Sequence, residues 1–338
     1  MPVSARIFIP DYSGENVLPS CLDSLISTVP ENIGITVIDN ASPVPSESLI
    51  SDRYRNRIEI LRLPKNLGYA SAISKAWEIC TEKYLIVANN DIEFLPGWFE
   101  AIIGFAEKNA AHAVSAVIEN ENETEKTANA SLNILLYLIP GIFRDRTKAV
   151  YPSGACFLLR HDLPGISIVD PDYFLYYEDV YIGFLLRSLG KTVIQCPDAK
   201  VRHRGSHAVK KFDRNKIAFY REYNRLVTQI LFFDFFSLVK LSPVIFFDSL
   251  LKIPECLIRG KPVWATISAH FHVLGNLGGI LEKRKMLRNL DGFDSRKIFP
   301  YLTSKILPSI NPFASFVNLL SALWCRLTGI PADREASE

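Results

Sequence analysis

A buried strand that ends in an acidic turn is predicted by residues 83–93, which read Lys83-Tyr84-Leu85-Ile86-Val87-Ala88-Asn89-Asn90-Asp91-Ile92-Glu93. The apolar run 84–88 is short and rich in β-branched and aromatic residues, as is typical of a strand in a largely parallel sheet. Ligands bind beyond the carboxyl ends of strands in such sheets, so the polar residues after Ala88 are expected to face a substrate. Their oxygen atoms suit Mg²⁺ or Mn²⁺. Taken alone, the turn is also compatible with a simple Asx cap.

Strand and helix patterns alternate on both sides of this stretch. The strands are predicted at residues 6–9, 34–38, 57–63, 84–88, 112–118, 156–159 and 192–196. Helices are predicted at residues 15–27, 69–81 and 96–108, and a further helix ends at Gly190. This alternation predicts an α/β fold with a mostly parallel central sheet flanked by helices.

Composition narrows the class of protein and its compartment. The chain has 338 residues, 48% hydrophobic content and a formal net charge of +2, which does not favour nucleic acid as a partner. The first residues run directly into a strand pattern without a long apolar signal region, so a cytoplasmic protein is expected. Six cysteines without C-x-x-C spacing favour reduced, mostly buried thiols.

The composition changes after residue 200. Residues 202–225 hold eight Lys or Arg against two acids, and residues 226–253 are strongly apolar with polar interruptions. No run of 18 uncharged apolar residues occurs there, which disfavours a spanning helix. On one continuous helix, Asp234, Ser237, Lys240 and Asp248 would share an arc of roughly 120°, leaving a wide apolar face. That face suits either a membrane interface or the protein's own core, and both remain open. We therefore expect a domain at residues 1–225 and a helical, partly amphipathic region at residues 226–338. The second region is the candidate for membrane association.

Six motifs between about residues 5 and 225 together resemble family 2 glycosyltransferases of the GT-A type, in particular the non-processive, rhamnosyltransferase-like branch. The first strand is not followed by G-x-G-x-x-G, which argues against a dinucleotide-dependent oxidoreductase. The motifs are Val37-Ile38-Asp39-Asn40-Ala41-Ser42, Asn66-Leu67-Gly68-Tyr69-Ala70, Asn89-Asn90-Asp91, Ser153-Gly154-Ala155, Phe174-Leu175-Tyr176-Tyr177-Glu178-Asp179-Val180 and His203-Arg204-Gly205-Ser206. The resemblance implies a GT-A fold with a Rossmann-like sheet.

The donor side of the site follows from this resemblance. It implies that Asp91 coordinates Mg²⁺ or Mn²⁺ at the donor diphosphate and that His203 completes the metal site. It also implies that Asp39 reads the base of a uridine or thymidine nucleotide, although a turn cap is an alternative role for Asp39. The residues expected around the nucleotide are Asp39, Asn66, Gly68, Asn90, Pro10 and Asp11. Arg204, Ser206 and His207 are further candidates for contacts with phosphate oxygens.

The acceptor side centres on Glu178 and Asp179. The resemblance implies that Asp179 is the general base that activates the acceptor hydroxyl. A helix N-terminus capped by acids is the structural alternative. Ser153, Gly154 and Ala155 resemble the small-residue turn beside the donor and acceptor sugars, and Tyr177 belongs to an aromatic run able to stack on sugar rings.

The expected function is inverting transfer of a single sugar from a UDP- or dTDP-linked donor to a hydroxyl of a lipid-linked or surface-polysaccharide acceptor. The chain lacks the Q-x-x-R-W stretch of processive synthases, which favours transfer of one sugar. The expected location is the inner face of the cytoplasmic membrane, as a peripheral protein; the sequence predicts no oligomeric state. A catalytically inactive, nucleotide-binding scaffold of a membrane glycan assembly is the alternative function.

Overall fold

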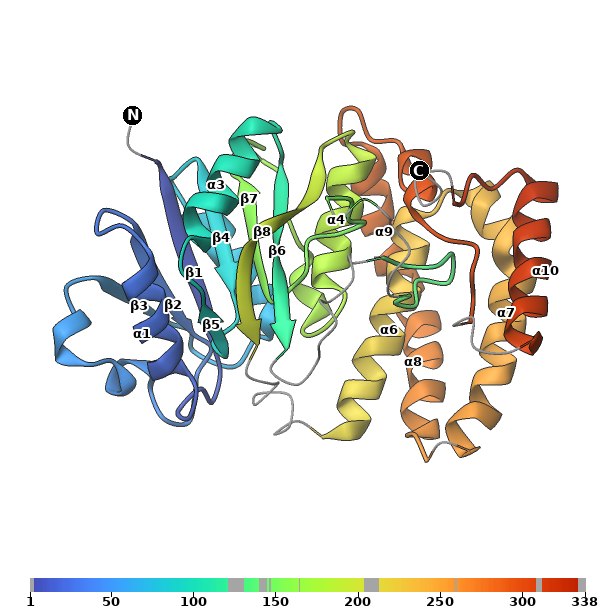
Figure 1. The fold of residues 1–338 in the computed structure, drawn as a ribbon. Helices are drawn as coiled ribbons and strands as arrows, with labels where there is room; N and C mark the ends of the chain where they lie inside the picture. Colours follow the sequence, from blue (N-terminus) through green and yellow to red (C-terminus); the bar gives the residue numbers. More distant parts are fainter. Residues whose placement is uncertain are drawn as a thin grey trace. The chain divides into compact units, whose positions relative to one another are not determined.

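The computed structural model describes residues 3–120, 131–139, 145, 147–163, 165–203, 213–258, 260–307 and 312–333. The chain forms two compact units whose segments interleave along the sequence. The first unit comprises Met1–Thr127, Pro152–Ile182 and Thr192–Phe212, and the second comprises Ala128–Tyr151, Gly183–Lys191 and Asp213–Glu338. Each unit is described separately below (Figure 1).

The first unit is built on an eight-stranded sheet with the order β3-β2-β1-β4-β7-β6-β8-β5. Its strands are β1 (Ala5–Asp11), β2 (Gly34–Asp39), β3 (Ile58–Arg62), β4 (Tyr84–Ala88), β5 (Ile92–Phe94), β6 (Ala113–Asn120), β7 (Cys156–Arg160) and β8 (Val193–His203). Strands β3, β2, β1 and β4 run parallel to one another, as do β6 and β8. Strand β7 is antiparallel to β4 and β6, and β5 is antiparallel to β8. The predicted α/β fold with a mostly parallel central sheet is therefore confirmed.

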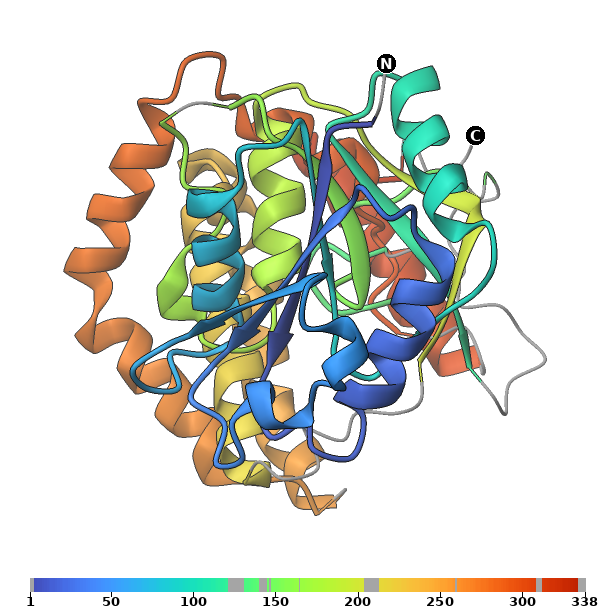
Figure 2. The same ribbon diagram turned by 90° about the vertical axis from the view of Figure 1, so that its left-hand side faces the viewer.

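Helices cover both faces of this sheet. Strand β1 alternates its side chains, so Ile7 and Ile9 join one core cluster while Phe8 is buried outside it. The helices α1 (Leu18–Thr28) and α3 (Trp98–Lys108) pack onto the face that carries Ile7 and Ile9. Helix α2 (Tyr69–Ile79) lies on the opposite face, as Figure 2 shows with α2 in light blue and α1 in dark blue on either side of the strands.

The second unit is largely helical. It contains α6 (Arg214–Phe232), α7 (Phe235–Ile258), α8 (Val263–Gly275), α9 (Leu277–Arg288) and α10 (Pro312–Thr328). It also holds most of α4 (Glu178–Ser188), which begins in the first unit. The predicted C-terminal helical region is therefore confirmed, with α6 running through residue 225.

The helical region is interrupted soon after residue 226. Residues 226–253 do not form a continuous helix, because the chain leaves α6 in an extended conformation at Phe233. Asp234 then caps α7: its carboxylate accepts a hydrogen bond from the backbone N–H of Ser237, at 2.9 Å. Pro243 and Pro254 lie inside α7.

No described helix is both long enough and apolar enough to cross a membrane. All six cysteines are buried as free thiols, in agreement with the sequence-based expectation of burial. Short 3₁₀ turns connect the larger elements at Ser46–Leu49, Asp52–Tyr54, Pro171–Tyr173, Ser295–Lys297 and Phe299–Tyr301.

Candidate active site

The acidic turn after β4 meets the last strand of the sheet through a pairing that the sequence did not reveal. Strand β5 begins at Ile92, immediately after Asp91, and its register places Ile92 opposite His203 of β8. As a result, His203 Nε2 lies 3.2 Å from Asp91 Oδ1. The side chain of Asp91 is 6% exposed and that of His203 is 19% exposed. The structure therefore brings together the two side chains predicted to bind metal.

Asp91 fits a cation ligand on geometric grounds. Its Oδ1 atom is buried and accepts no hydrogen bond from any described residue. A buried carboxylate oxygen without a donor is costly unless a cation or another charged group meets it. The described residues contain no cluster of three or more His, Cys, Asp or Glu side chains able to hold a metal. Two protein ligands are nevertheless typical of Mg²⁺ sites that rely on substrate phosphates and water for the remaining positions.

Asp11 anchors the strand ends beside this turn. Its carboxylate is 1% exposed and accepts hydrogen bonds from the amide of Asn90 and from the hydroxyls of Ser46, at 2.6 Å, and Ser42, at 3.3 Å. Burial raises the pKa of Asp11, and the hydrogen bonds from Ser46 and Asn90 oppose that shift. Pro10 is buried one residue earlier in β1. Asp11 and Asn90 therefore form a buried hydrogen-bonded pair, and Asp11 orients the acidic turn through it.

Asp39 is engaged by its own turn. One carboxylate oxygen accepts the backbone N–H of Ser42 at 2.7 Å, and the other accepts the N–H of Ser46 at 3.1 Å. The guanidinium of Arg62, directly opposite in β3, also pairs with the second oxygen. With 1% of the residue exposed, the carboxylate in this structure acts as a turn cap. Arg62 itself keeps 44% of its side chain exposed beside this position.

The turn at Asn66–Gly68 is held to the end of β2 by Asn40. The Asn40 side chain donates to the carbonyl of Gly68 at 2.9 Å and accepts the N–H of Leu67 at 2.8 Å. Asn66 closes the turn by accepting the N–H of Gly68 at 2.9 Å. Gly68 has φ +87°, and a Cβ atom there would lie 2.4 Å from the carbonyl oxygen of Phe174. The glycine is therefore required by a close approach to the protein's own backbone.

Tyr69 links the metal-side turn to the small-residue turn. Its hydroxyl lies 2.7 Å from Asn89 Oδ1 and 2.9 Å from the carbonyl oxygen of Gly154, so the single O–H proton is shared between these two acceptors. The N–H of Asn89 also bonds the carbonyl of Ala155, at 2.9 Å. Burial, with smaller contributions from Glu178 and Asp179, raises the pKa of Tyr69 well above its usual value, so the hydroxyl stays protonated and donates.

Asp179 continues this chain of contacts. Its Oδ2 accepts the N–H of Gly154 at 3.1 Å, and its Oδ1 accepts the N–H of Val180 at 2.8 Å. A Cβ atom at Gly154 would lie 3.1 Å from Asp179 Oδ2, so the small residue leaves room for the carboxylate. Hydrogen bonds thus run from Asn89 through Tyr69 and Gly154 to Asp179.

The two acids at the start of α4 differ in environment. Glu178 is 6% exposed, and its Oε2 is buried without a hydrogen-bond donor among the described residues. Asp179 is partly exposed. Burial raises the pKa of both carboxyls, and the adjacent Asp179 raises that of Glu178 further. A partly exposed acid with a raised pKa is suited to accept a proton near neutral pH.

A strained segment leads into these acids. Phe174, Tyr176 and Tyr177 have φ values of 54°, 69° and 68°, in the left-handed region that non-glycine residues rarely adopt. The carbonyl of Phe174 accepts the N–H of Tyr69 at 2.6 Å, at the first turn of α2. Strain of this kind costs on the order of 1–3 kcal/mol per residue and clusters at functional sites.

The remaining predicted residues fall on the same unit or outside the described part of the chain. Ser153 and Tyr177 are partly exposed, and Ala155 is buried. Arg204, Ser206 and His207 lie outside the described residues. Sequence reasoning missed the bonding roles of Asn40, Ser46 and Tyr69. Asn40 and Tyr69 belong to two of the six motifs named above. Asn40 follows a strand and Tyr69 begins a helix, and a polar group at such a position could have indicated a bonding role.

Comparison with known proteins agrees with this geometry. Residues 6–163 match the family described as Glycosyl transferase family 2. An N-acetylglucosaminyl-diphospho-decaprenol L-rhamnosyltransferase of Mycobacterium tuberculosis is 25% identical over 251 residues, covering 64% of this chain and 80% of the relative. The amylovoran biosynthesis glycosyltransferase AmsE of Erwinia amylovora is 26% identical over 244 residues, covering 67% of this chain and 89% of the relative.

Solved structures share the fold. A crystal structure of GalNAc-T7 with UDP, GalNAc and Mn²⁺ superposes with a TM-score of 0.55 at 14% identity, covering 77% of this chain but only 58% of that one. S. aureus TarS 1–349 in complex with UDP superposes with a TM-score of 0.52 at 11% identity, covering 96% of this chain and 90% of that one. The matched residues, the sheet topology and these relatives lead to one conclusion: residues 6–163 belong to glycosyl transferase family 2, and the chain is a glycosyltransferase with rhamnosyltransferase-like relatives.

Proposed function

We propose that this glycosyltransferase moves one sugar, with inversion, from a UDP- or dTDP-linked donor to a hydroxyl of a lipid-linked or surface-polysaccharide acceptor in cell-envelope glycan synthesis. The observation that carries the proposal is the chain of hydrogen bonds from Asn89 through Tyr69 and Gly154 to Asp179. It couples the acidic turn, which suits a leaving diphosphate, to a partly exposed carboxylate, which suits an acceptor hydroxyl. Both tasks are needed in glycosyl transfer.

The donor nucleotide is assigned to the ends of β1, β2 and β4. In this proposal Asp11 and Asn90 fix the acidic turn, and the turn capped by Asp39 provides backbone groups for the base. Asn66 and Gly68 line the neighbouring turn. The candidate contact of Asp39 with the base requires its carboxylate to give up one of its present partners on binding. Arg62, exposed at 44% of its side chain, is an additional donor for this region.

Asp91 and His203 would hold a Mg²⁺ or Mn²⁺ ion together with the donor's phosphate oxygens. A bound cation there supplies charge neutralisation for the departing diphosphate. The support is Oδ1 of Asp91, which is buried, accepts no hydrogen bond from the described residues and lies 3.2 Å from His203 Nε2. The protein's own share is to keep these two side chains converging, which the pairing of β5 with β8 achieves.

Asp179 would take the proton of the acceptor hydroxyl as that oxygen attacks the anomeric carbon. Its raised pKa and partial exposure support the role. Glu178 is buried beside it, and burial together with the charge of Asp179 raises the pKa of Glu178, so Glu178 would stay protonated. Ser153, Gly154, Ala155 and Tyr177 would border the donor and acceptor sugars. Inversion requires the acceptor oxygen to attack the anomeric carbon from the side opposite the leaving diphosphate, and this proposal assigns the two tasks to Asp179 and to the acidic turn.

The names of two relatives support the proposed acceptor. The mycobacterial relative is named for L-rhamnose transfer to an N-acetylglucosaminyl-diphospho-decaprenol, and AmsE for amylovoran biosynthesis. We therefore assign a lipid-linked acceptor of the polyprenyl diphosphate class, with nucleotide-linked L-rhamnose as the first donor to test. An acceptor held in a bilayer implies that the enzyme works as a peripheral protein at the cytoplasmic face of the membrane. The second unit is the part assigned to membrane association.

Calorimetry tests the donor site directly. UDP and dTDP are titrated against GDP, ADP and CMP with Mn²⁺ or Mg²⁺ present, using the wild type, Asp91→Ala and the control Asp198→Ala, an exposed acid on β8. We expect metal-dependent binding of a uridine or thymidine diphosphate that Asp91→Ala loses and Asp198→Ala keeps. Absence of binding to every nucleotide would refute the transferase proposal. The anomeric configuration of a transfer product, read by NMR, then tests inversion.

A further inference from the structure

Helix α7 of the second unit presents apolar side chains to solvent. Its exposed large hydrophobic residues are Phe235, Phe236, Val239, Phe246, Phe247, Leu250, Leu251, Ile253, Leu257 and Ile258. At 100° per residue these positions fall within an arc of roughly 160° on the helix. Phe246 is 64% exposed and Phe247 is 60% exposed. A contiguous face of this kind is unusual on a water-soluble surface and marks an interaction site.

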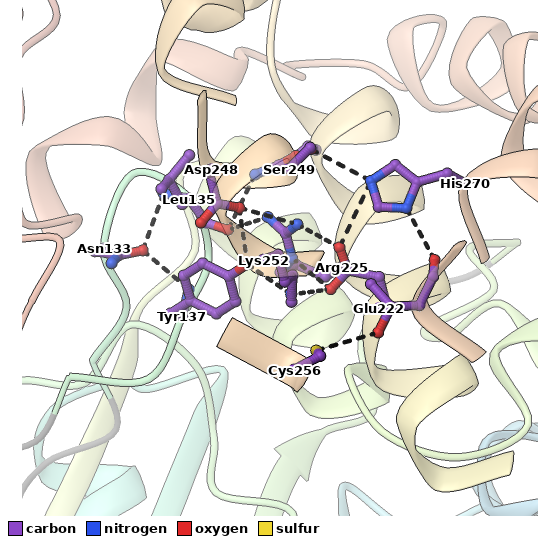
Figure 3. A network of polar contacts seen from close by, with 12 residues as sticks. Asn133, Leu135, Tyr137, Glu222, Arg225, Asp248, Ser249, Lys252, Cys256 and His270 are labelled. Atoms are coloured by element: carbon purple, nitrogen blue, oxygen red, sulfur yellow. Dashed lines mark hydrogen bonds and ion pairs between the residues drawn. The ribbon is translucent and has the colours of Figure 1, made fainter. Parts of the chain in front are cut away.

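Two charged residues of α7, Asp248 and Lys252, lie on the opposite side of the helix and point into the protein. Figure 3 shows Asp248 and Lys252 converging with Arg225 and Glu222 of α6 around the ring of Tyr137. The Tyr137 hydroxyl donates to Asp248 at 2.8 Å and accepts from Lys252 at 2.6 Å, and Lys252 also pairs with Glu222. Asp248 and Lys252 have side chains only 17% and 16% exposed. Helix α7 thus buries Asp248 and Lys252 while it exposes a wide apolar face, the reverse of a helix packed on a soluble core.

Helix α10 likewise exposes apolar side chains and buries small or polar ones. It exposes Phe313, Phe316, Leu319, Leu320, Leu323 and Leu327, which share an arc of roughly 120°. Its buried side chains are small or polar: Ala314, Asn318, Ser321 and Cys325. Asn318 is fully engaged there, since it accepts the N–H groups of Ile306 and Leu307 and donates to the carbonyl of Leu307.

The two helices are neighbours, and the region around them is positively charged. The indole of Trp324 in α10 donates to the carbonyl of Lys240 in α7 at 2.9 Å. Of the chain's 38 Lys and Arg and 36 Asp and Glu, residues 226–338 hold 13 and 9, a net charge of +4, whereas residues 1–225 are net −2. Trp264, 80% exposed, follows three residues after the exposed Lys261, a pairing typical of membrane interfaces.

We propose that the outward faces of α7 and α10 insert into the headgroup and upper acyl region of an anionic phospholipid bilayer. This inference rests on the proposed membrane location and names the surface responsible for it. No described helix is able to span a bilayer, which agrees with helices lying in the interface. A second copy of the chain fits less well, because pairing these faces would bring two regions of net charge +4 together, while anionic headgroups attract them.

Vesicle co-sedimentation tests the proposal on the full-length protein. The probes are vesicles of phosphatidylcholine alone and of phosphatidylcholine with phosphatidylglycerol, at low salt and at 1 M NaCl. We expect binding to the anionic vesicles that 1 M NaCl weakens but does not abolish, because apolar burial is insensitive to screening. Complete release in 1 M NaCl, or no binding to anionic vesicles at all, would overturn insertion.

Substitutions locate the contact. We expect Phe246→Ser/Phe247→Ser to weaken vesicle binding on the order of a hundredfold, since each inserted phenyl ring accounts for roughly tenfold or more. Phe246→Asp/Phe247→Asp should weaken it further. The matched control Ser27→Asp/Asn109→Asp adds the same two charges at exposed positions of the first unit and should bind nearly as the wild type does. Wild-type binding by both Phe246/Phe247 variants would refute the assignment of this face.

Two further readouts separate the alternatives. Trp264 fluorescence should be quenched by lipids brominated on the acyl chains, and Trp264→Phe should remove that signal. Sedimentation velocity without lipid should give the same oligomeric state for wild type and Phe246→Ser/Phe247→Ser; a wild-type dimer that the variant dissociates would identify a second copy as the occupant and overturn the proposal. Nucleotide binding is measured on the same samples. Vesicle binding without nucleotide binding would leave this inference standing while the proposed transferase site fails.

Discussion

The hydroxyl group of Tyr69 connects two turns of the candidate site. Its single O–H proton is shared between Asn89 Oδ1 and the carbonyl of Gly154 inside the protein. We expect Tyr69→Phe to lower the free energy of unfolding by about 1–3 kcal/mol, because buried acceptors lose their donor. We also expect kcat to fall more than KM changes, since the turn beside Asp179 loosens. Urea unfolding and steady-state kinetics measure both.

Tyr220→Phe in the second unit is the matched control for loss of a tyrosine hydroxyl, and it should leave kcat unchanged. Equal kcat for Tyr69→Phe and the wild type would show that the Tyr69 bridge has no part in catalysis.

The pH dependence of activity distinguishes the roles of Asp179 and Glu178. A general base works as the carboxylate, and burial raises the pKa of Asp179 above the usual value for Asp, about 4. Activity should therefore fall as the pH drops through a limb that lies above that value. In Asp179→Asn we expect kcat to fall by roughly 10²-fold or more and the acid limb to vanish, with donor binding retained.

Glu178→Gln is the companion variant, because glutamine resembles the neutral form that burial favours at this position. It should keep most of kcat and leave the acid limb near its wild-type position, since a neutral Glu178 carries no charge that could raise the pKa of Asp179. If Glu178→Gln loses activity while Asp179→Asn keeps it, the base is Glu178.

How well individual site residues could be predicted from the sequence depended on how far along the chain their partners lie. Asp91 and Asp179 stand out because each is an acid at the boundary of a strand or helix pattern. The partners of Tyr69 could not be predicted, because Asn89 and Gly154 lie 20 and 85 residues away. Asp39 illustrates the opposite case: a local turn cap and a ligand contact give the same sequence pattern, and only the bonds to Ser42, Ser46 and Arg62 show the cap.

At the scale of elements, the short strand β5 was the main omission. Its three residues, Ile92–Phe94, are too few for an alternating pattern to be recognised. Strand β8 was predicted over 192–196, whereas it continues to His203. Charged residues in its second half hid that continuation, since Arg202 pairs with Glu93 and Lys200 with Glu119 across the strands. The contact between Asp91 and His203 depends on both missed segments.

The break between α6 and α7 was missed for a related reason. Hydrophobic periodicity continued through it, and the single cap at Asp234 gave little signal. We expect Asp234→Ala to lower the free energy of unfolding by about 1 kcal/mol, because the N–H of Ser237 loses its acceptor. Asp234→Ser should retain most of the stability. Chemical denaturation compares the three proteins, and equal stability of Asp234→Ala and the wild type would show that the cap is unimportant.

On the scale of the whole molecule, the second unit contains a buried set of charges. Although burial opposes its ionisation, Arg225 and Lys252 lower the pKa of Glu222 from 4.5 to about 2. A depressed pKa in the folded state contributes stability above pH 4.5, and that contribution is lost as the pH falls from about 4.5 to about 2. The guanidinium of Arg225, 1% exposed, depends on this partner.

Glu222→Gln should therefore destabilise the protein at neutral pH by about 3–5 kcal/mol, because it leaves buried cations without their anion. The difference from the wild type should shrink below pH 4.5. Thermal unfolding across pH measures it, and Glu282→Gln, an exposed acid on α9, is the control. A deficit that stays constant with pH would exclude ionised Glu222 as the source.

The general architecture was predictable because alternating strands and helices leave few α/β arrangements. The direction in which α7 faces was not. The sequence left open whether the apolar face of residues 226–253 meets a membrane or the protein's own core, and in the structure Asp248 of the polar arc lies inside, with Tyr137 and Arg225. Hydrophobic periodicity indicates that a helix has a polar and an apolar face. It does not indicate which face is exposed on the protein surface and which packs inside.

Strand β5 has a consequence for biosynthesis. It lies at the edge of the sheet, and β8, its only neighbour in the strand order, is the last strand of the unit to leave the ribosome. A nascent chain therefore carries Asp91 for about a hundred residues of synthesis before His203 can meet it. Long-range pairing of this kind forms late in folding. Transferase activity should thus appear only after His203 has left the ribosome, and chains truncated before this residue should be unable to act on a donor.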